Sequence, residues 1–160
     1  MSSIQTGGTP RAPSFVSFVN PLIRRLVGAG MPFGPNVLLT VRGRTSGVPR
    51  TFPVAVVEVR GRRFVQSPFG EVNWVRNLRA AGEAVVSKGR RKETVDAVEI
   101  GPEEGGPILR EALAPYVRSP VLARVLGRFF DLRPTSTPED YVAEARRHPM
   151  FELRPRMTVR

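Results

Sequence analysis

Residues 41–77 read VRGRTSGVPRTFPVAVVEVRGRRFVQSPFGEVNWVRN, and this stretch decides the fold. Aliphatic and β-branched residues lie on both sides of a glycine-containing turn, a pattern typical of two strands joined by a hairpin. Along the stretch the pattern predicts strands at 36–42, 51–59 and 63–66 and a short helix at 71–81. Short connections of this kind favour an antiparallel sheet over repeated βαβ units. Strand 51–59 is nearly continuous in apolar character, so we expect it to be central in the sheet.

The remaining segments complete a single α+β domain built on a small antiparallel barrel. Helical periodicity and the start signatures Ser119-Pro120 and Thr137-Pro138-Glu139-Asp140 predict helices at 14–29, 103–117, 119–130 and 137–147. Further strands are predicted at 84–87, 93–100 and 149–153. Residues 1–13 are rich in Ser, Gly, Thr and Pro, which is typical of a flexible tail, and the domain is expected to span 14–160.

The chain carries a net charge of +11, almost all of it from arginine, since Lys88 and Lys92 are the only lysines. Such a charge attracts nucleic acid, anionic lipid or a polyanionic small molecule. Recognised nucleic-acid motifs and aromatic stacking platforms are missing, so no specific nucleic acid is expected. The helix containing Phe15–Val27, with Arg24 and Arg25, either covers one end of the barrel or makes peripheral contact with a membrane.

Several chemistries are excluded by composition. The chain has no cysteine, which removes disulfides, thiolate catalysis and cysteine-ligated metals, and its single histidine leaves no histidine cluster for a metal. We therefore expect no metal site. No apolar run approaches the roughly 20 residues that span a bilayer. Together these features favour a cytoplasmic location.

The turn after the first strand has the composition of an anion site. Gly43 and Gly47 permit close backbone approach, and successive amides in such a turn can form a concavity that holds an anion. Hydroxyl groups and arginines surround them, at Arg42, Arg44, Thr45, Ser46 and Arg50. Because neither a Walker motif nor a dinucleotide fingerprint is present, the turn alone is equally consistent with an ordinary basic hairpin.

A second candidate element follows at residues 67–77. The loop with Pro68 and Gly70 exposes backbone groups, and Trp74 and Asn77 lie three residues apart on one face of the helix. Trp74 offers a flat apolar surface, and Asn77 offers both a donor and an acceptor. These two residues could wall a planar ring, although a lone tryptophan more often packs in a core.

Taken in order, GRTSGVPRTFP (43–53), SPFG (67–70) and NWVRNLR (73–79) resemble the deazaflavin-dependent nitroreductase family, and HPMFEL (148–153) is similar to the end of its members. The resemblance covers about residues 37–153. It implies a split antiparallel β-barrel of the flavin-reductase and pyridoxamine-phosphate-oxidase type with flanking helices. It also implies binding of reduced coenzyme F-420, an 8-hydroxy-5-deazaflavin with a phosphate and an oligoglutamate tail, in preference to FMN or FAD.

The resemblance further implies which residues meet the cofactor. Arg44, Thr45, Ser46 and Arg50 would meet the phosphate and tail, in a groove to which Arg42, Arg90 and Arg91 add charge. The ring would lie against the other candidates, and the whole set is Arg44, Thr45, Ser46, Gly47, Arg50, Pro53, Ser67, Pro68, Phe69, Gly70, Trp74 and Asn77. Many relatives have lysine where this chain has Thr45, which removes one charge from the tail site.

The implied activity is hydride transfer from the reduced deazaflavin to an electron-poor small molecule, such as a quinone or a nitroaromatic. The cofactor would perform the chemistry, so no catalytic residue is assigned; Tyr116, Tyr141 and His148 are the candidate proton donors or pocket walls. The alternative is a non-catalytic carrier of a flavin, a tetrapyrrole or a fatty acid on the same barrel. The chain is expected to be a monomer or a homodimer.

Overall fold

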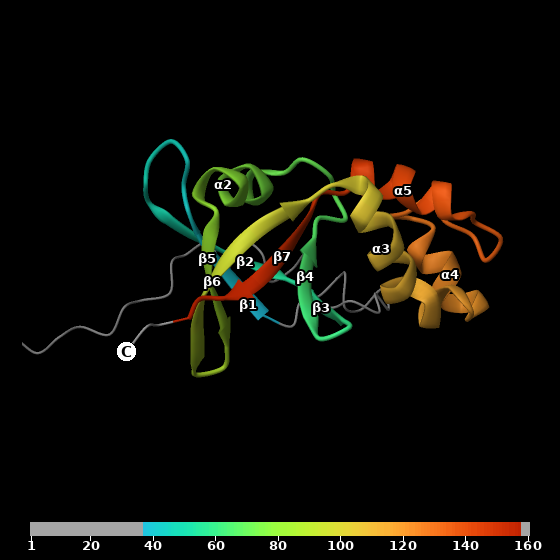
Figure 1. Cartoon of the computed structure of the whole chain (residues 1–160), viewed down its shortest axis with the longest axis horizontal. Helices are drawn as coiled ribbons and strands as arrows, with labels where there is room; N and C mark the ends of the chain where they lie inside the picture. The colour runs from blue at the N-terminus through green and yellow to red at the C-terminus, as the bar shows by residue number, and fades with distance from the viewer. Residues whose placement is uncertain (1–36, 158–160) are drawn as a thin grey trace, which may run out of the picture.

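The computed structural model describes residues 37–157 (Figure 1). The strands in this region are β1 (Val37–Arg42), β2 (Pro49–Val54), β3 (Val56–Val59), β4 (Arg62–Gln66), β5 (Glu83–Lys88), β6 (Arg91–Ile100) and β7 (Met150–Pro155). The helices are α2 (Asn73–Ala81), α3 (Pro102–Val117), α4 (Pro120–Leu126) and α5 (Pro138–Arg147). The predicted helix at 14–29 and the predicted tail at 1–13 lie outside the described residues.

The strands form one seven-stranded sheet in the order β2-β1-β5-β6-β7-β4-β3, and every pairing is antiparallel. β2 and β3 occupy the two edges of this sheet, yet only Ala55 separates them in the chain. The two edges must therefore lie together, so the sheet curls round on itself. The predicted α+β class and the split antiparallel β-barrel with flanking helices are confirmed.

The expectation of a single central strand at 51–59 is wrong. The segment is divided at Ala55 into β2 and β3, and both are edge strands. Pro49 and Pro53 both lie in β2. Proline has no N–H to donate, so it is confined to positions where a neighbouring strand does not need that donor, as on a sheet edge. The two prolines indicated an edge strand, but the apolar character of the segment was given more weight.

The described helices gather at two places around the sheet (Figure 1). α2 covers one end of the barrel and buries Val75 and Leu78 completely in the barrel core. α3, α4 and α5 lie together at the other side, over a second apolar cluster that includes Phe64, Leu109 and Phe130. No described helix is both long enough and apolar enough to cross a membrane.

The helix starts differ from their signatures in one respect. Thr137 caps α5 as predicted, and the cap is reciprocal: its hydroxyl accepts from the Asp140 amide at 3.3 Å, and Asp140 Oδ2 accepts from the Thr137 amide at 2.8 Å. Ser119 stands at the start of α4 but its side chain makes no capping bond. α4 ends at Leu126 instead of continuing to Phe130, because the amides of Arg128 and Phe129 bond to carbonyls three residues back instead of four.

Candidate functional site

The turn between β1 and β2 is closed by its own backbone. The Gly43 amide donates to Val48 O and the Gly47 amide donates to Gly43 O, both at 2.9 Å. A Cβ on Gly43 would lie 2.9 Å from Ser46 Oγ and 3.0 Å from the Val48 carbonyl oxygen, closer than real side chains come. Gly43 is therefore needed for the tight approach of the two strands at this point.

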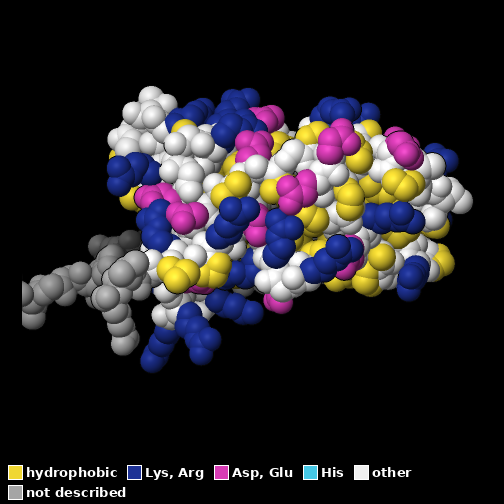
Figure 2. Space-filling model, viewed as in Figure 1, with side chains coloured by type: hydrophobic (Ala, Val, Ile, Leu, Met, Phe, Trp, Pro, Cys, Tyr) yellow, Lys and Arg dark blue, Asp and Glu magenta, His cyan; other side chains and the backbone are white. Residues whose placement is uncertain are grey.

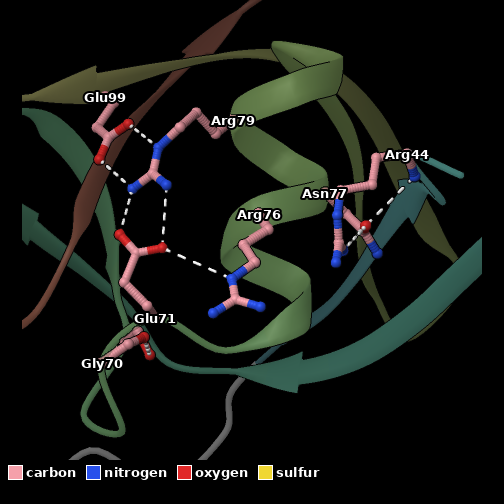
Figure 3. A network of polar contacts seen from close by, with 8 residues as sticks. Arg44, Gly70, Glu71, Arg76, Asn77, Arg79 and Glu99 are labelled. Carbon is pink, nitrogen blue, oxygen red and sulfur yellow. Dashed lines mark hydrogen bonds and ion pairs between the residues drawn. The ribbon is translucent and has the colours of Figure 1, made fainter.

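Asn77 joins helix α2 to this turn. Its Oδ1 accepts two hydrogen bonds from Arg44, one from the backbone amide at 3.2 Å and one from Nη1 at 2.8 Å (Figure 3). The Asn77 side chain is buried, so this link is shielded from water. Asn77 therefore supports the turn, and its expected part in a ring pocket beside Trp74 stays a prediction.

The turn's amides are mostly used within the protein. Those of Gly43, Arg44 and Gly47 bond as described, and the Val48 amide donates to Ser46 Oγ at 3.2 Å. Within residues 37–157 this leaves the amides of Thr45 and Ser46 without a bond. An anion at the turn would therefore meet side chains more than the row of free amides that the sequence suggested.

Side chains of the turn and of α2 enclose a polar pocket of about 670 Å³. Its lining includes two guanidinium groups and no carboxylate, and consists of Gly43, Arg44, Thr45, Ser46, Val48, Pro49, Arg50, Thr51, Phe52, Asn73 and Asn77. Neither Arg44 nor Arg50 forms an ion pair with any described acidic residue. The pocket is therefore a place of uncompensated positive charge.

Three arginines expected in the groove lie elsewhere. Arg42 does not line the pocket. Arg90 and Arg91 belong to the β5–β6 turn, and the register of β1 with β5 places Ser87 opposite Leu38. That turn therefore extends from the end of the sheet opposite to the 43–48 turn, as Figure 1 shows. The expectation that Arg90 and Arg91 share a groove with Arg44 is wrong, because hairpin order alone does not say which end of the sheet a turn occupies.

A smaller apolar pocket, of about 130 Å³, adjoins the polar one along β2. It brings together four of the predicted ring contacts, Pro53, Pro68, Phe69 and Trp74. The rest of its wall comes from the barrel, α3 and the segment after α4, at Val54, Ala55, Val57, Gln66, Leu109, Ala112, Leu113, Phe130 and Met150. Phe52 and Pro53 are consecutive, as are Asn73 and Trp74, and each pair is divided between the two pockets, so the two linings meet on β2 and at the start of α2.

The predicted residues Ser67 and Gly70 shape the loop but do not line either of these two pockets. Ser67 is fully buried; its Oγ donates to Gly70 O at 2.7 Å and its amide donates to Pro149 O at 3.1 Å. Gly70 has a φ of 76°, in the left-handed region that favours glycine. Gly47 likewise forms the turn without facing the pocket. Ser67 and Gly70 thus hold the intervening Pro68 and Phe69 against the apolar pocket.

An ion-pair network that sequence reasoning missed fixes α2 (Figure 3). Arg79 donates to Glu71 Oε1 through Nη2 and to Glu99 Oε2 through Nε, both at 2.6 Å. Hydrogen bonding to Arg79 lowers the pKa of the Glu71 carboxyl. Glu71 precedes α2, which begins at Asn73, and helical pairing joins residues three or four apart, so no local sequence pattern indicates this pair. The partner Glu99 comes from β6 and could not have been found without the fold.

None of the three candidate proton donors lines the polar or the apolar pocket. Tyr116 packs at the edge of the second apolar cluster. Tyr141 is buried in that cluster, and burial raises its pKa. Both ring nitrogens of His148 lie 3.1 Å from acceptor oxygens inside the protein. Within the described part of the chain, no group of three or more acidic or histidine residues could hold a metal ion.

The family of the chain is shown by its sequence. A family model described as F420H(2)-dependent quinone reductase matches residues 20–118. This match spans more than half of the chain, so the chain belongs to that family. The protein is thus a reductase of the type that uses reduced coenzyme F-420 and acts on a small molecule. The predicted cofactor and the predicted class of oxidoreductase are confirmed at this level.

Solved structures similar to this chain include an F420-H2 dependent reductase (FDR-A), with 23% identity, 74% of this chain and 93% of the other covered, and a TM-score of 0.49. A candidate pyridoxamine 5'-phosphate oxidase from Listeria innocua has 10% identity, coverage of 85% and 94%, and a TM-score of 0.49. An F420 reductase has 14% identity, coverage of 80% and 92%, and a TM-score of 0.41. No curated protein matches the chain.

Proposed function

We propose that this chain catalyses hydride transfer from reduced coenzyme F-420 to an electron-poor acceptor such as a quinone or a nitroaromatic. The observation that supports the proposal is the pairing of two pockets along β2, one cationic and one apolar. A ligand with an anionic tail and a flat apolar head requires this combination. The family match supplies the identity of that ligand.

The polar pocket suits the phosphate and the acidic tail of the coenzyme. Its volume falls within the range of about 300–1,000 Å³ that is usual for ligand sites, whereas that of the apolar pocket is below it. Arg50 is exposed and unpaired among the described residues, so its guanidinium is available for a bidentate contact with a phosphate. Thr45 and Ser46 would add hydroxyl donors. Arg44 retains further donors beyond the one directed at Asn77.

The apolar pocket would receive the edge of the ring and the acceptor. When bound, the reduced deazaflavin supplies the hydride. The protein's part is to orient the reactants and to exclude water, which the side chains of Trp74, Phe69 and Pro53 can do. No described acid or base lies in this pocket, so we assign no protein group to proton transfer.

The test is turnover with the purified full chain. The reduced coenzyme is mixed with the protein, and its oxidation is followed by absorbance with and without a soluble benzoquinone or a nitroaromatic. We expect oxidation that requires both protein and acceptor, and tighter binding of F-420 than of FMN or FAD in parallel titrations. Stoichiometric binding without oxidation would identify a carrier instead, and absence of binding would refute the proposal.

Three further expectations stay predictions. We propose that residues 14–160 act as one domain, most of which the described sheet and helices form, and that the protein is a monomer or a homodimer. Peripheral membrane contact through Phe15–Val27 concerns residues outside the described part of the chain. Sedimentation of the full chain alone measures the oligomeric state, and sedimentation with anionic vesicles measures the membrane contact.

A further inference from the structure

We propose that His148 is a positioning residue, held as an imidazolium by Glu144, that fixes the Pro68–Phe69 wall of the apolar pocket. His148 immediately follows α5 and precedes β7. The structural half of this inference stands on the contacts of His148 alone. Its functional half rests on the proposed function, because it assumes that the apolar pocket receives the reactants.

Two acceptors flank the imidazole ring. Nδ1 lies 3.1 Å from the carbonyl oxygen of Ser67, and Nε2 lies 3.1 Å from Glu144 Oε2. A carbonyl oxygen can only accept, and a carboxylate can only accept, whereas a neutral imidazole has one N–H. Ser67 is fully buried, and Glu144 and His148 are 3% and 8% exposed, so an acceptor left without a donor here would be costly. The pair therefore needs one proton more than neutral histidine and a carboxylate together provide.

Three features place that proton on His148. Glu144 Oε1 also accepts from Arg147 Nη1 at 3.1 Å, which favours the ionised carboxylate. His148 stands at the C-terminus of α5, where the helix dipole favours a cation. The ring of Phe130 lies 4.7 Å away, centroid to centroid, and an aromatic face attracts a cation.

Other charged groups face the same hollow without bonding to the ring. Arg128 and Asp131, from the segment after α4, line it together with Glu144 and Arg147 of α5. The two arginines oppose an imidazolium, and Asp131 favours one. Among these groups only Glu144 is within hydrogen-bond distance of His148 in the described structure. The direct, buried contact is therefore the one that decides the charge of the ring.

The hydrogen bond between His148 and the Ser67 carbonyl links the imidazole ring to the pocket wall. Pro68 and Phe69 belong to no helix or strand, and both line the apolar pocket. Phe69 is 53% exposed and touches Phe129 edge-on, with ring centroids 5.9 Å apart. The wall is thus anchored mainly through Ser67, whose amide bonds Pro149 and whose carbonyl meets His148. Removing the His148 donor would free one of these two anchors and leave the Ser67 carbonyl only the 3.4 Å bond from the Gly70 amide of the same loop.

The first experiment reads the proton directly. His148 is the only histidine of the chain, so its ring nitrogens give the only imidazole signals in a nitrogen-15 spectrum of the full-length protein. At pH 7 we expect both nitrogens to be protonated. In Glu144→Gln the amide can donate to Nε2, so we expect a neutral ring with its proton on Nδ1. A wild-type ring with one bare nitrogen at pH 7 would overturn the imidazolium.

The second experiment reads the wall. His148→Leu removes the donor to Ser67, whereas His148→Asn places an amide nitrogen where Nδ1 stood. We expect the leucine variant to raise the KM for the acceptor about tenfold, as the loss of one buried hydrogen bond allows, with kcat little changed. The asparagine variant should lie close to wild type. Equal KM values in all three proteins, or equal impairment of both variants, would overturn the positioning role.

These readouts separate this inference from the proposed function. The amide signals of Phe69 and Gly70 in the coenzyme-free protein should shift in His148→Leu and remain near wild type in His148→Asn. If the leucine variant does not fold, the other two measurements still decide. Shifted Phe69 and Gly70 signals in the asparagine variant would overturn the positioning role, and the nitrogen-15 spectrum of the wild-type protein still tests the imidazolium. Failure of the coenzyme to bind wild-type protein would refute the proposed function and leave these signals readable.

Discussion

The turn at 43–48 and the turn at 88–92 are both basic and contain glycine, but their surroundings differ. Both join antiparallel strands, both contain a glycine with positive φ (Gly47 at 70° and Gly89 at 60°), and both carry arginines that form no ion pair with a described acidic residue. The first turn is bonded to α2 through Asn77 and faces a pocket, whereas a Cβ on Gly89 would meet nothing within 4 Å. Basic side chains project into solvent at the lower end of the molecule, where the second turn lies (Figure 2). The two turns therefore share charge and differ in support, because the first is hydrogen-bonded to a helix and lines a pocket with it.

Replacing one arginine beside the first turn and one in the second tests this difference most strongly. Arg50→Ala should weaken coenzyme binding by about 1.5–3 kcal/mol, the value of a charge-assisted hydrogen bond, which is roughly 10- to 100-fold in Kd. Arg90→Ala removes the same charge from the opposite end of the sheet and should leave Kd nearly unchanged. Calorimetric titration of each variant measures both. Equal losses would mean that net charge, and not position, holds the coenzyme.

The link from α2 to the first turn can be cut separately. Asn77→Ala leaves the Arg44 amide without its buried acceptor, so we expect a loss of about 1–3 kcal/mol in the free energy of unfolding together with weaker coenzyme binding. Asn73→Ala is the matched control, because Asn73 lines the same pocket but is exposed. Chemical denaturation followed by titration gives both quantities. A stable Asn77→Ala protein with wild-type affinity would show that the turn does not depend on α2.

The two turns also differ in how they should tolerate a methyl group. Gly43→Ala forces a Cβ against the Val48 carbonyl, an overpacking cost of about 1–3 kcal/mol, and should lower coenzyme affinity as the hairpin opens. Gly89→Ala meets no atoms but adopts the left-handed region, at a cost of about 1–2 kcal/mol, and should not affect binding. Thermal denaturation and titration of both variants provide the comparison. Reduced affinity in Gly89→Ala would contradict it.

The smallest expected effect is on the pH dependence of stability, and it concerns arginines that form ion pairs. Hydrogen bonds from Arg62, and then from Arg154, lower the pKa of Glu152 to about 2. A carboxyl whose pKa is lowered by folding stabilises the protein above its unfolded-state value and loses that contribution as the pH falls toward 2. The effect is weakened by the solvent around Arg62, whose side chain is 42% exposed. Glu152→Gln should flatten the dependence of unfolding on acid pH, and an unchanged profile would assign it to other groups.

Much of the fold was readable because local patterns and global structure agree. The capping box at Thr137 and the hairpins around 43–48 and 88–92 are short-range features, and the structure has them. The division at Ala55 was missed because one central strand and two consecutive edge strands can have the same continuous apolar sequence. The prolines in β2 carried the missing information.

Less of the candidate site was readable, because its assembly depends on pairings distant in sequence. The sequence pointed to Asn77 but not to its hydrogen bonds with Arg44, because that partner is 33 residues away. The same distance effect misplaced Arg90 and Arg91, whose location follows from strand register. The buried contact between His148 and Ser67 spans 81 residues and left no local signal.

A crystal structure of the full chain with reduced coenzyme F-420 tests the central claim most directly. We expect the phosphate of the coenzyme to lie within hydrogen-bond distance of Arg50 and of a hydroxyl of Thr45 or Ser46, with the ring directed toward Trp74. A phosphate bound at the 88–92 turn, or anywhere outside the pocket between the first turn and α2, would contradict the account.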